Sequence, residues 1–290
     1  MSGAGVVVTT EWLEAHLDDP DLVVVEVDEK PLIHRLGHIP GAHNLDWRTD
    51  IQDPRTRDIP GPAAVRELWA KLGVTRSSTV VFYGDKSNWY ASYGAWLFRL
   101  HGAKDVRVLD GGRQRWVVED RPLSKAAAAP PGAAPLKPKL DPGLRIGWRE
   151  IPAAVRHGAQ LVDVRTTAEY IGAVISEPGY PEESAQRPGH IPSAIGMPWD
   201  VMLDPSGLLL PEPELLGQLA AHGIDPEREL ILYCRIGERS AHTWFVLNEV
   251  LGLEARNYDG SWIEWGSMVG MPIALGEDPG DAAELERLAD

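Results

Sequence analysis

The feature that most constrains this chain of 290 residues is that it carries one ordered set of markers twice. The tetrapeptide Gly-His-Ile-Pro occurs at 37–40 and again at 189–192, and an Asp-Gly pair occurs at 110–111 and at 259–260. Aromatic residues repeat in the same order, as Trp47 with Trp199, Tyr83 with Tyr233, Trp96 with Trp244 and Trp116 with Trp265. All these offsets lie between 148 and 152 residues. Offsets this steady predict two copies of one domain of ordinary size rather than a solenoid of short repeats.

A stretch rich in alanine and proline separates the two copies. Residues 126–132 read Ala-Ala-Ala-Ala-Pro-Pro-Gly, a composition that buries too little apolar surface to pack by itself and is typical of an extended linker. We therefore expect an N-terminal domain over 1–123, a linker over 124–143, a C-terminal domain over 144–276 and an acidic tail over 277–290. The tail is expected to be frayed, with one short helical turn.

Within each half, short apolar runs alternate with amphipathic stretches. The runs predict strands at Leu22–Val27, Thr79–Tyr83, Val106–Leu109, Gln160–Val164 and Leu230–Tyr233. The amphipathic stretches predict helices at Ala63–Leu72, Tyr90–Leu100, Glu214–His222 and Ser240–Leu251. Strands that alternate with helices predict an α/β fold in each half, a mostly parallel sheet covered by helices on both faces.

The composition of the chain limits which partners we expect it to bind and in which compartment we expect it to work. The net charge of −15 opposes binding to nucleic acid or to an anionic membrane. The single cysteine excludes an internal disulfide, and neither a signal-like N-terminus nor an apolar run of 18 residues is present. We expect a cytoplasmic monomer that attracts a small anion through local rather than overall charge.

The only cysteine lies where its surroundings favour a reactive thiol. Four apolar residues, Leu230–Tyr233, run directly into Cys234, and a helical pattern follows after a short loop. Such a loop turns backbone N–H groups inward, and Arg235 and Arg239 flank it, so we expect a thiol pKa of roughly 3.5–7.5. Gly237 lets so short a loop turn. Most lone cysteines are inert buried residues, but two arginines and a glycine within five residues favour a thiolate that attacks an anionic substrate.

The loop also resembles that of a known family. Cys-Arg-Ile-Gly-Glu-Arg-Ser at 234–240, followed by His-Thr-Trp-Phe-Val-Leu at 242–247, is similar to the active-site loop of the rhodaneses, the thiosulfate sulfurtransferases. The resemblance extends over nearly the whole chain and is closest to the two-domain bacterial enzymes. It implies tandem rhodanese-like domains, with Cys234 as nucleophile. The substrate-binding residues it implies are Arg235, Ile236, Gly237, Glu238, Arg239 and Ser240 of the loop, with an aromatic wall of Trp89, Tyr90 and Trp199.

The reaction that the resemblance implies is sulfur transfer in two steps. The Cys234 thiolate takes the outer sulfur of thiosulfate and releases sulfite, and cyanide or a thiol then removes the sulfur from the resulting persulfide. We expect no metal and no organic cofactor. The alternatives are 3-mercaptopyruvate as the donor, a cysteine phosphatase-like enzyme, and a persulfide carrier without enzymatic turnover. Phosphatases place five residues between cysteine and arginine, whereas four separate Cys234 from Arg239.

Comparison of the two halves separates architecture from chemistry. The first half has Gly84-Asp85-Lys86-Ser87-Asn88-Trp89 where the second has its loop, so we expect it to be inactive. His38 and His190 occur in both halves and are expected to stabilise turns, and Asp163 and Arg165 are expected to form a structural pair. Vertebrate rhodaneses carry a substrate-binding arginine just before the tyrosine of this segment, whereas this chain has Glu169 before Tyr170.

Overall fold

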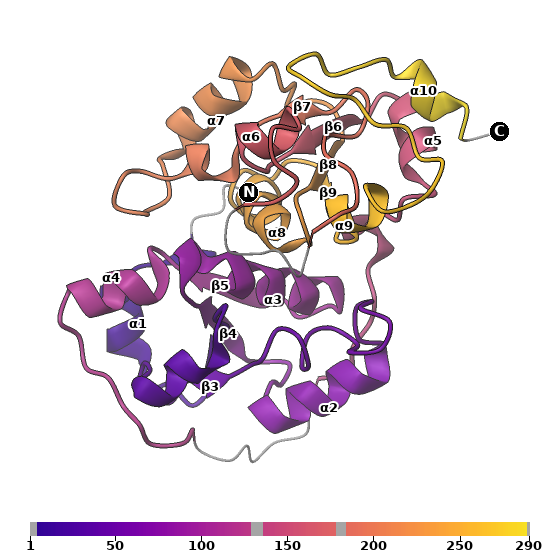
Figure 1. The fold of residues 1–290 in the computed structure, drawn as a ribbon. Helices are drawn as coiled ribbons and strands as arrows, with labels where there is room; N and C mark the ends of the chain where they lie inside the picture. The colour runs from indigo at the N-terminus through magenta and orange to yellow at the C-terminus, as the bar shows by residue number, and fades with distance from the viewer. Residues whose placement is uncertain (1–4, 129–135, 178–183, 289–290) are drawn as a thin grey trace. The chain divides into compact units, whose positions relative to one another are not determined.

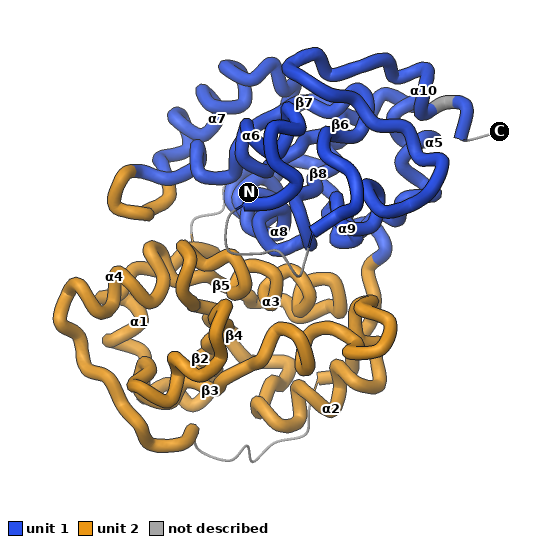
Figure 2. The backbone as a smooth tube through the Cα atoms, viewed as in Figure 1, with its two compact units in different colours: residues 1–2, 142–204, 210–290 blue, residues 3–141, 205–209 orange. Residues whose placement is uncertain are grey.

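The structure is a computed structural model that describes residues 5–128, 136–177 and 184–288 (Figure 1). The chain forms two compact units (Figure 2). Apart from the first two residues, one comprises Gly3–Asp141 with Pro205–Leu209, and the other comprises Pro142–Asp204 with Leu210–Asp290. Every strand pair in both sheets is parallel. The predicted α/β class is therefore confirmed.

The first unit is built on a five-stranded sheet of order β1-β5-β4-β2-β3. Its strands are β1 Val7–Val8, β2 Leu22–Glu26, β3 His43–Asn44, β4 Thr79–Tyr83 and β5 Asp105–Leu109. Its helices are α1 Thr10–His16, α2 Pro62–Leu72, α3 Trp89–Leu100 and α4 Gly112–Val118, with shorter 3₁₀ turns η1 Pro31–Leu36 and η2 Lys86–Asn88.

Both faces of this sheet are covered, which explains why its strands are almost continuously apolar. Val81 of β4 packs in one core cluster with Leu13 of α1 and Trp116 of α4. Phe82, the next residue, points to the opposite face, where its ring lies 4.9 Å from that of Phe98 in α3.

The second unit is built on a four-stranded sheet of order β7-β6-β8-β9. Its strands are β6 Gln160–Asp163, β7 Ile195–Gly196, β8 Leu230–Tyr233 and β9 Ala255–Asn257. Its helices are α5 Ile151–Arg156, α6 Thr167–Tyr170, α7 Glu212–Ala221, α8 Glu238–Trp244, α9 Ser261–Trp265 and α10 Ala283–Glu286. Shorter turns are η3 Pro142–Leu144 and η5 Trp199–Met202, and η6 Phe245–Val250 is a π-helical continuation of α8.

The acidic tail differs from its prediction. Its one helical turn is present as α10, but Leu285 on that turn is fully buried in the core cluster that includes Ile151 of α5 and Trp265 of α9. The backbone just before the tail is also fixed, because Ala274 pairs with His190 in an antiparallel bridge. The expectation of a frayed tail was therefore wrong for this turn, because its apolar side chain is buried in the core.

The predicted helix over 240–251 is also corrected. It begins two residues earlier, at Glu238, and changes after Trp244 into the π-helical segment η6. The earlier start leaves only four residues, 234–237, between β8 and α8. Glu238 and Arg239, which the sequence pattern placed in the loop, therefore belong to the first turn of the helix.

The duplicated histidines have the expected structural role. His190 places its ring nitrogens 2.8 Å from the carbonyl oxygen of Tyr170 and 3.2 Å from that of Asp278. His38 similarly lies 3.0 Å from the carbonyl oxygen of His34 and 2.9 Å from that of Ala126. Each ring therefore joins two backbone segments.

Each of the two sheets has an ion pair at the end of a central strand, and the two pairs are formed by different residues. In the second sheet Arg165 donates to the carboxylate of Asp163 and, over 2.6 Å, to the carbonyl oxygen of Gly189, which confirms the expected structural pair. In the first sheet Arg113 of α4 donates to Glu26 and to the carbonyl oxygen of Gly37. In both units, the carboxylate at the end of the strand and a glycine carbonyl oxygen thus accept from one arginine. The two arginines belong to different elements.

Candidate active site

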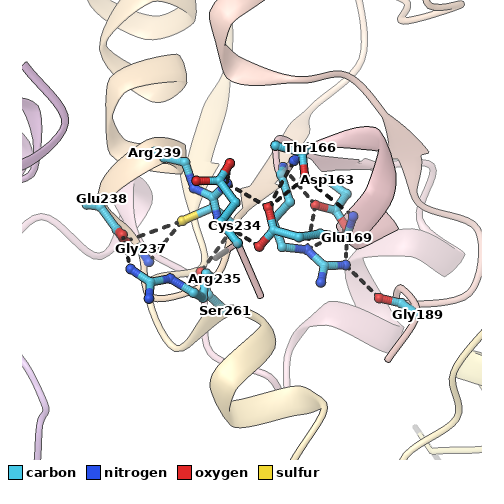
Figure 3. A network of polar contacts seen from close by, with 12 residues as sticks. Asp163, Thr166, Glu169, Gly189, Cys234, Arg235, Gly237, Glu238, Arg239 and Ser261 are labelled. Atoms are coloured by element: carbon cyan, nitrogen blue, oxygen red, sulfur yellow. Dashed lines mark hydrogen bonds and ion pairs between the residues drawn. The ribbon is translucent and has the colours of Figure 1, made fainter. Parts of the chain in front are cut away.

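The candidate site is the four-residue loop between β8 and α8 (Figure 3). Cys234 is fully buried, and its backbone N–H donates to the hydroxyl oxygen of Ser261 over 3.1 Å. The backbone N–H of Gly237 donates to the Cys234 sulfur, also over 3.1 Å. Gly237 has a φ of 103°, and a Cβ at this position would lie 2.9 Å from the carbonyl oxygen of Asp259. Glycine is therefore required for the loop to bring an N–H group to the sulfur.

The structure corrects the expected acidity of the thiol. Burial raises the pKa of Cys234 above its ordinary value, and the negative charge of Glu238 raises it further. The guanidinium of Arg239 and the bonds from Ser240 lower the pKa without outweighing burial. The expected low pKa rested on the arginines and the loop N–H groups and did not include burial or the carboxylate of Glu238. The resting thiol is protonated at neutral pH.

The first arginine of the loop is paired with a carboxylate. Nη2 of Arg235 donates to Oε1 of Glu238 over 3.2 Å, and both side chains are almost completely buried. The other carboxylate oxygen of Glu238, Oε2, lies 3.5 Å from the sulfur of Cys234 and accepts from the thiol. Glu238 therefore lies between the arginine and the nucleophile.

The second arginine is paired with the residue that departs from the vertebrate pattern. Arg239 donates to Glu169 of α6 through both terminal nitrogens, over 2.8 and 3.0 Å. Burial alone would raise the pKa of Glu169, but the bonds and charge of Arg239 outweigh it and hold that pKa below its ordinary value. Glu177 lies 3.5 Å from the same guanidinium. The expected picture of two arginines turned only toward a substrate anion is therefore corrected, because each also binds a carboxylate of the protein.

The other predicted site residues fall into two groups. Ile236 and Ser240 are buried within the loop and the first turn of α8, and the Ser240 hydroxyl donates to the carbonyl oxygen of Gly237 over 3.1 Å. Trp199 of η5 packs edge-on against His242 of α8, with ring centres 5.3 Å apart.

The remaining two predicted aromatic residues belong to the first unit. Trp89 and Tyr90 begin α3, both are buried, and the Tyr90 ring lies 4.8 Å from that of Trp47. Their contribution to an aromatic wall stays a prediction.

Ser261 is a site residue that the sequence analysis did not assign. It follows the second Asp-Gly pair, and the first half has Gly112 at the corresponding place, one residue after Asp110-Gly111. The comparison of the two halves could have identified it, because a hydroxyl is present only in the half that carries the cysteine. Ser261 fixes the backbone of Cys234 from the neighbouring loop after β9.

No cluster of metal-ligating side chains is present in the described part of the chain. Across residues 5–128, 136–177 and 184–288, no group of three or more His, Cys, Asp or Glu side chains is arranged so that it could hold a metal ion.

Over the same residues, no helix has the length and apolar character needed to cross a membrane.

The family match covers both units. A family described as "Rhodanese-like domain" matches residues 9–119 and again residues 150–268. The two matches coincide with the two copies inferred from the repeated markers. Both the duplication and the resemblance predicted from the loop are confirmed.

Relatives match along nearly the whole chain. A protein of Thermus thermophilus named "Sulfur carrier protein TtuD" is 44% identical over 278 residues, which are 94% of this chain and 98% of the relative. A protein of Mycolicibacterium smegmatis named "Putative thiosulfate sulfurtransferase" is 44% identical over 277 residues, 95% of this chain and 100% of the relative. The names describe a carrier and an enzyme respectively.

Solved structures show the same fold at lower identity. A complex of EanB with ergothioneine matches with a TM-score of 0.82 at 24% identity, over 95% of this chain and 71% of that one. The crystal structure of YnjE gives the same TM-score and identity over 98% of this chain and 70% of that one. At this identity the likeness concerns the fold alone.

Proposed function

Because the chain belongs to the rhodanese family, we propose that it is a sulfurtransferase that moves sulfur from thiosulfate to cyanide or a thiol through a Cys234 persulfide. The observation that supports this most directly is the short contact of 3.1 Å between the Gly237 N–H and the Cys234 sulfur. A donor at that distance stabilises negative charge on sulfur, both in the attacking thiolate and in the persulfide. We place the reaction in the cytoplasm, where a lone catalytic thiol stays reduced.

The proposed reaction has two balanced steps. Cys234 loses its proton and attacks the outer sulfur of thiosulfate, a new S–S bond forms, and the electron pair of the donor's own S–S bond leaves with sulfite. The acceptor then attacks the terminal sulfur of the persulfide and returns the Cys234 thiolate. The positive charge of Arg239, which lowers the thiol pKa, favours the anionic sulfur in both steps.

A carrier function is the second candidate, because the Thermus relative, 44% identical, is named a sulfur carrier. In a carrier the persulfide would pass to a partner protein, and thiosulfate turnover would be a side reaction. Phosphoryl transfer is disfavoured, because Arg239 is bound by Glu169 through two bonds and so does not close a phosphate cradle around the thiol.

Steady-state kinetics distinguish the enzyme from the carrier. The wild-type protein should produce thiocyanate from thiosulfate and cyanide, with a kcat/KM for thiosulfate at or above about 10⁴ M⁻¹s⁻¹, the low end for typical enzymes. Cys234→Ser should produce none. A kcat/KM far below this value would favour the carrier. If turnover were faster with 3-mercaptopyruvate, that compound would replace thiosulfate as the proposed donor. If the protein cleaved an aryl phosphate and this activity depended on Cys234, the result would instead support a cysteine phosphatase-like enzyme.

A further inference from the structure

The carboxylate of Glu238 lies beside the sulfur of Cys234 (Figure 3). Its Oε2 accepts from the thiol over 3.5 Å, while its Oε1 is held 3.2 Å from Nη2 of Arg235. The exposed fraction of Cys234 is 0% and that of Glu238 is 2%, so bulk water has almost no access to the proton between them. The thiol therefore has a hydrogen-bonded carboxylate beside it in a site almost inaccessible to bulk water.

The other charged groups around α8 are engaged elsewhere. From α6, Glu169 binds Arg239 through both oxygens. From the loop after β9, Asp259 binds Arg145 through both oxygens, over 2.7 and 3.0 Å. Among the described residues, Glu238 is the carboxylate that hydrogen-bonds the thiol.

Two further titratable groups lie near the first turn of α8. Glu177 lies 3.5 Å from Nη1 of Arg239, the same nitrogen that donates to Oε2 of Glu169. His242, one helical turn after Glu238, is buried, and its burial lowers the pKa of the imidazole to about 4. This histidine is neutral at pH 7 and adds no charge to the site.

On the basis of the proposed sulfur transfer, we propose that Glu238 takes the thiol proton as Cys234 attacks the donor and passes it to the departing sulfite. The bond between Sγ and hydrogen breaks, Oε2 gains the proton, and the Cys234 sulfur forms its bond to the outer sulfur of thiosulfate. The S–S bond of thiosulfate breaks, and sulfite leaves as hydrogen sulfite with that proton. Thiol and thiosulfate dianion thus become persulfide anion and hydrogen sulfite, with atoms and charge balanced.

This assignment gives Arg235 a positioning role. Its bond to Oε1 turns Oε2 toward the sulfur, and its charge offsets the negative charge that Glu238 brings into the site. The raised pKa of the thiol fits this arrangement, because a thiol that rests protonated needs a local acceptor when it reacts.

The test separates the proton step from sulfur transfer itself. The pH dependence of thiolate absorbance near 240 nm is recorded for wild type and Glu238→Gln with Cys234→Ser as the blank, since Cys234 is the only cysteine. The pH dependence of sulfite release is then recorded by rapid mixing with thiosulfate. Glu214→Gln on α7 is the control, because Glu214 is exposed and its replacement removes the same charge. Glu238→Asp keeps a carboxylate and tests for rescue.

In wild type, sulfite release should be independent of pH between 6 and 8, because the proton passes from the thiol through Glu238 to sulfite without exchange with bulk water. In Glu238→Gln the thiol pKa should fall, yet sulfite release at pH 7 should be slower by about 100-fold and should rise about tenfold per pH unit below the new thiol pKa. Glu238→Asp should regain the flat profile, and Glu214→Gln should match wild type.

Three results would overturn the assignment: equal or faster sulfite release by Glu238→Gln at pH 7, an unchanged pH profile in that variant, or an unchanged thiol pKa. The first result would mean that Glu238 slows the reaction of the thiol instead of accepting its proton. If wild type released no sulfite at all, the proposed function would fail instead. The absorbance titration needs no donor, so it would still decide whether Glu238 interacts with the thiol.

Discussion

The pairing of Arg239 with Glu169 explains a departure from the vertebrate rhodaneses at the level of single residues. By the resemblance described above, those enzymes carry an arginine where this chain has Glu169. Here the carboxylate and the guanidinium face each other in a buried site, with exposed side-chain fractions of 0% and 2%. In this chain the positive charge beside Glu169 of α6 comes from Arg239 of α8.

Removing one member of this pair should be costly. Arg239→Ala leaves Glu169 as an unpaired buried charge, so we expect the free energy of unfolding to fall by about 3–5 kcal/mol. The double variant Glu169→Gln with Arg239→Gln should recover much of this loss, since neither side chain then carries a charge. Urea denaturation measures both. Arg55→Ala, which breaks a pair with Asp53 in which the arginine is 87% exposed, serves as control and should change stability by less than about 1 kcal/mol. A loss that small for Arg239→Ala would show that the buried pair is not needed.

A buried carboxyl in the first unit should make stability depend on pH. Asp28 follows β2 at the position that Arg165 occupies after β6, and it is fully buried. Burial, and then the charge of Glu26, raise the pKa of Asp28 to about 8. Because the folded state holds this proton more tightly than the unfolded chain, the stability it contributes is complete below the ordinary pKa of about 3.9 and is lost as the pH rises through about 8.

The prediction concerns the difference between wild type and Asp28→Asn. Between pH 5 and pH 9 the urea midpoint of wild type should fall relative to that of Asp28→Asn, which has no carboxyl to ionise at this position. The amide retains an oxygen that can accept the Asp85 N–H, which donates to Asp28 over 2.8 Å. A wild-type midpoint that rises with pH relative to the variant would contradict this account.

At the scale of elements, the two strand-to-helix loops differ in shape as well as in sequence. Gly84 follows β4 as Cys234 follows β8. A Cβ on Gly84 would lie 2.1 Å from the carbonyl oxygen of Val27, so no side chain fits there without a backbone shift. The three residues that follow Asp85 (Lys86, Ser87 and Asn88) all have positive φ values, between 49° and 68°. The first loop is therefore shaped differently and does not simply lack a cysteine.

A cysteine introduced into the first loop should not create a second site. Gly84→Cys should lower the free energy of unfolding by about 1–3 kcal/mol through overpacking, as should Gly84→Ala. After treatment with thiosulfate, the mass of the Gly84→Cys protein should still increase by one sulfur atom rather than two. A stable variant that gains two sulfur atoms would show that the first domain needs only a nucleophile to become active.

At the scale of the whole molecule, the repeated markers predicted the duplication, and the alternation of apolar runs with amphipathic stretches predicted the α/β class of each copy. The strands with strong apolar runs, Thr79–Tyr83 and Leu230–Tyr233, end where they were predicted to end. The strands β1, β3, β7 and β9 were missed because each has only two or three residues, too few to show a period of two.

The candidate site was less predictable than the fold. Its sequence-local part, the loop around Cys234, was visible because the residues are adjacent in the chain. The partners of the arginines and of the cysteine backbone were not, because Glu169 precedes Arg239 by 70 residues and Ser261 follows Cys234 by 27. The acidity of the thiol was predicted with the wrong sign for the same reason, since burial is a property of the packed molecule.

The central claim is that Cys234 carries sulfur, and the intact mass of the purified, reduced protein tests it most directly. Thiosulfate should add one sulfur atom to wild type and none to Cys234→Ser, and cyanide added afterwards should remove that atom as thiocyanate. A wild-type mass unchanged by both thiosulfate and 3-mercaptopyruvate, or a Cys234→Ser protein that gains the same atom, would contradict the account.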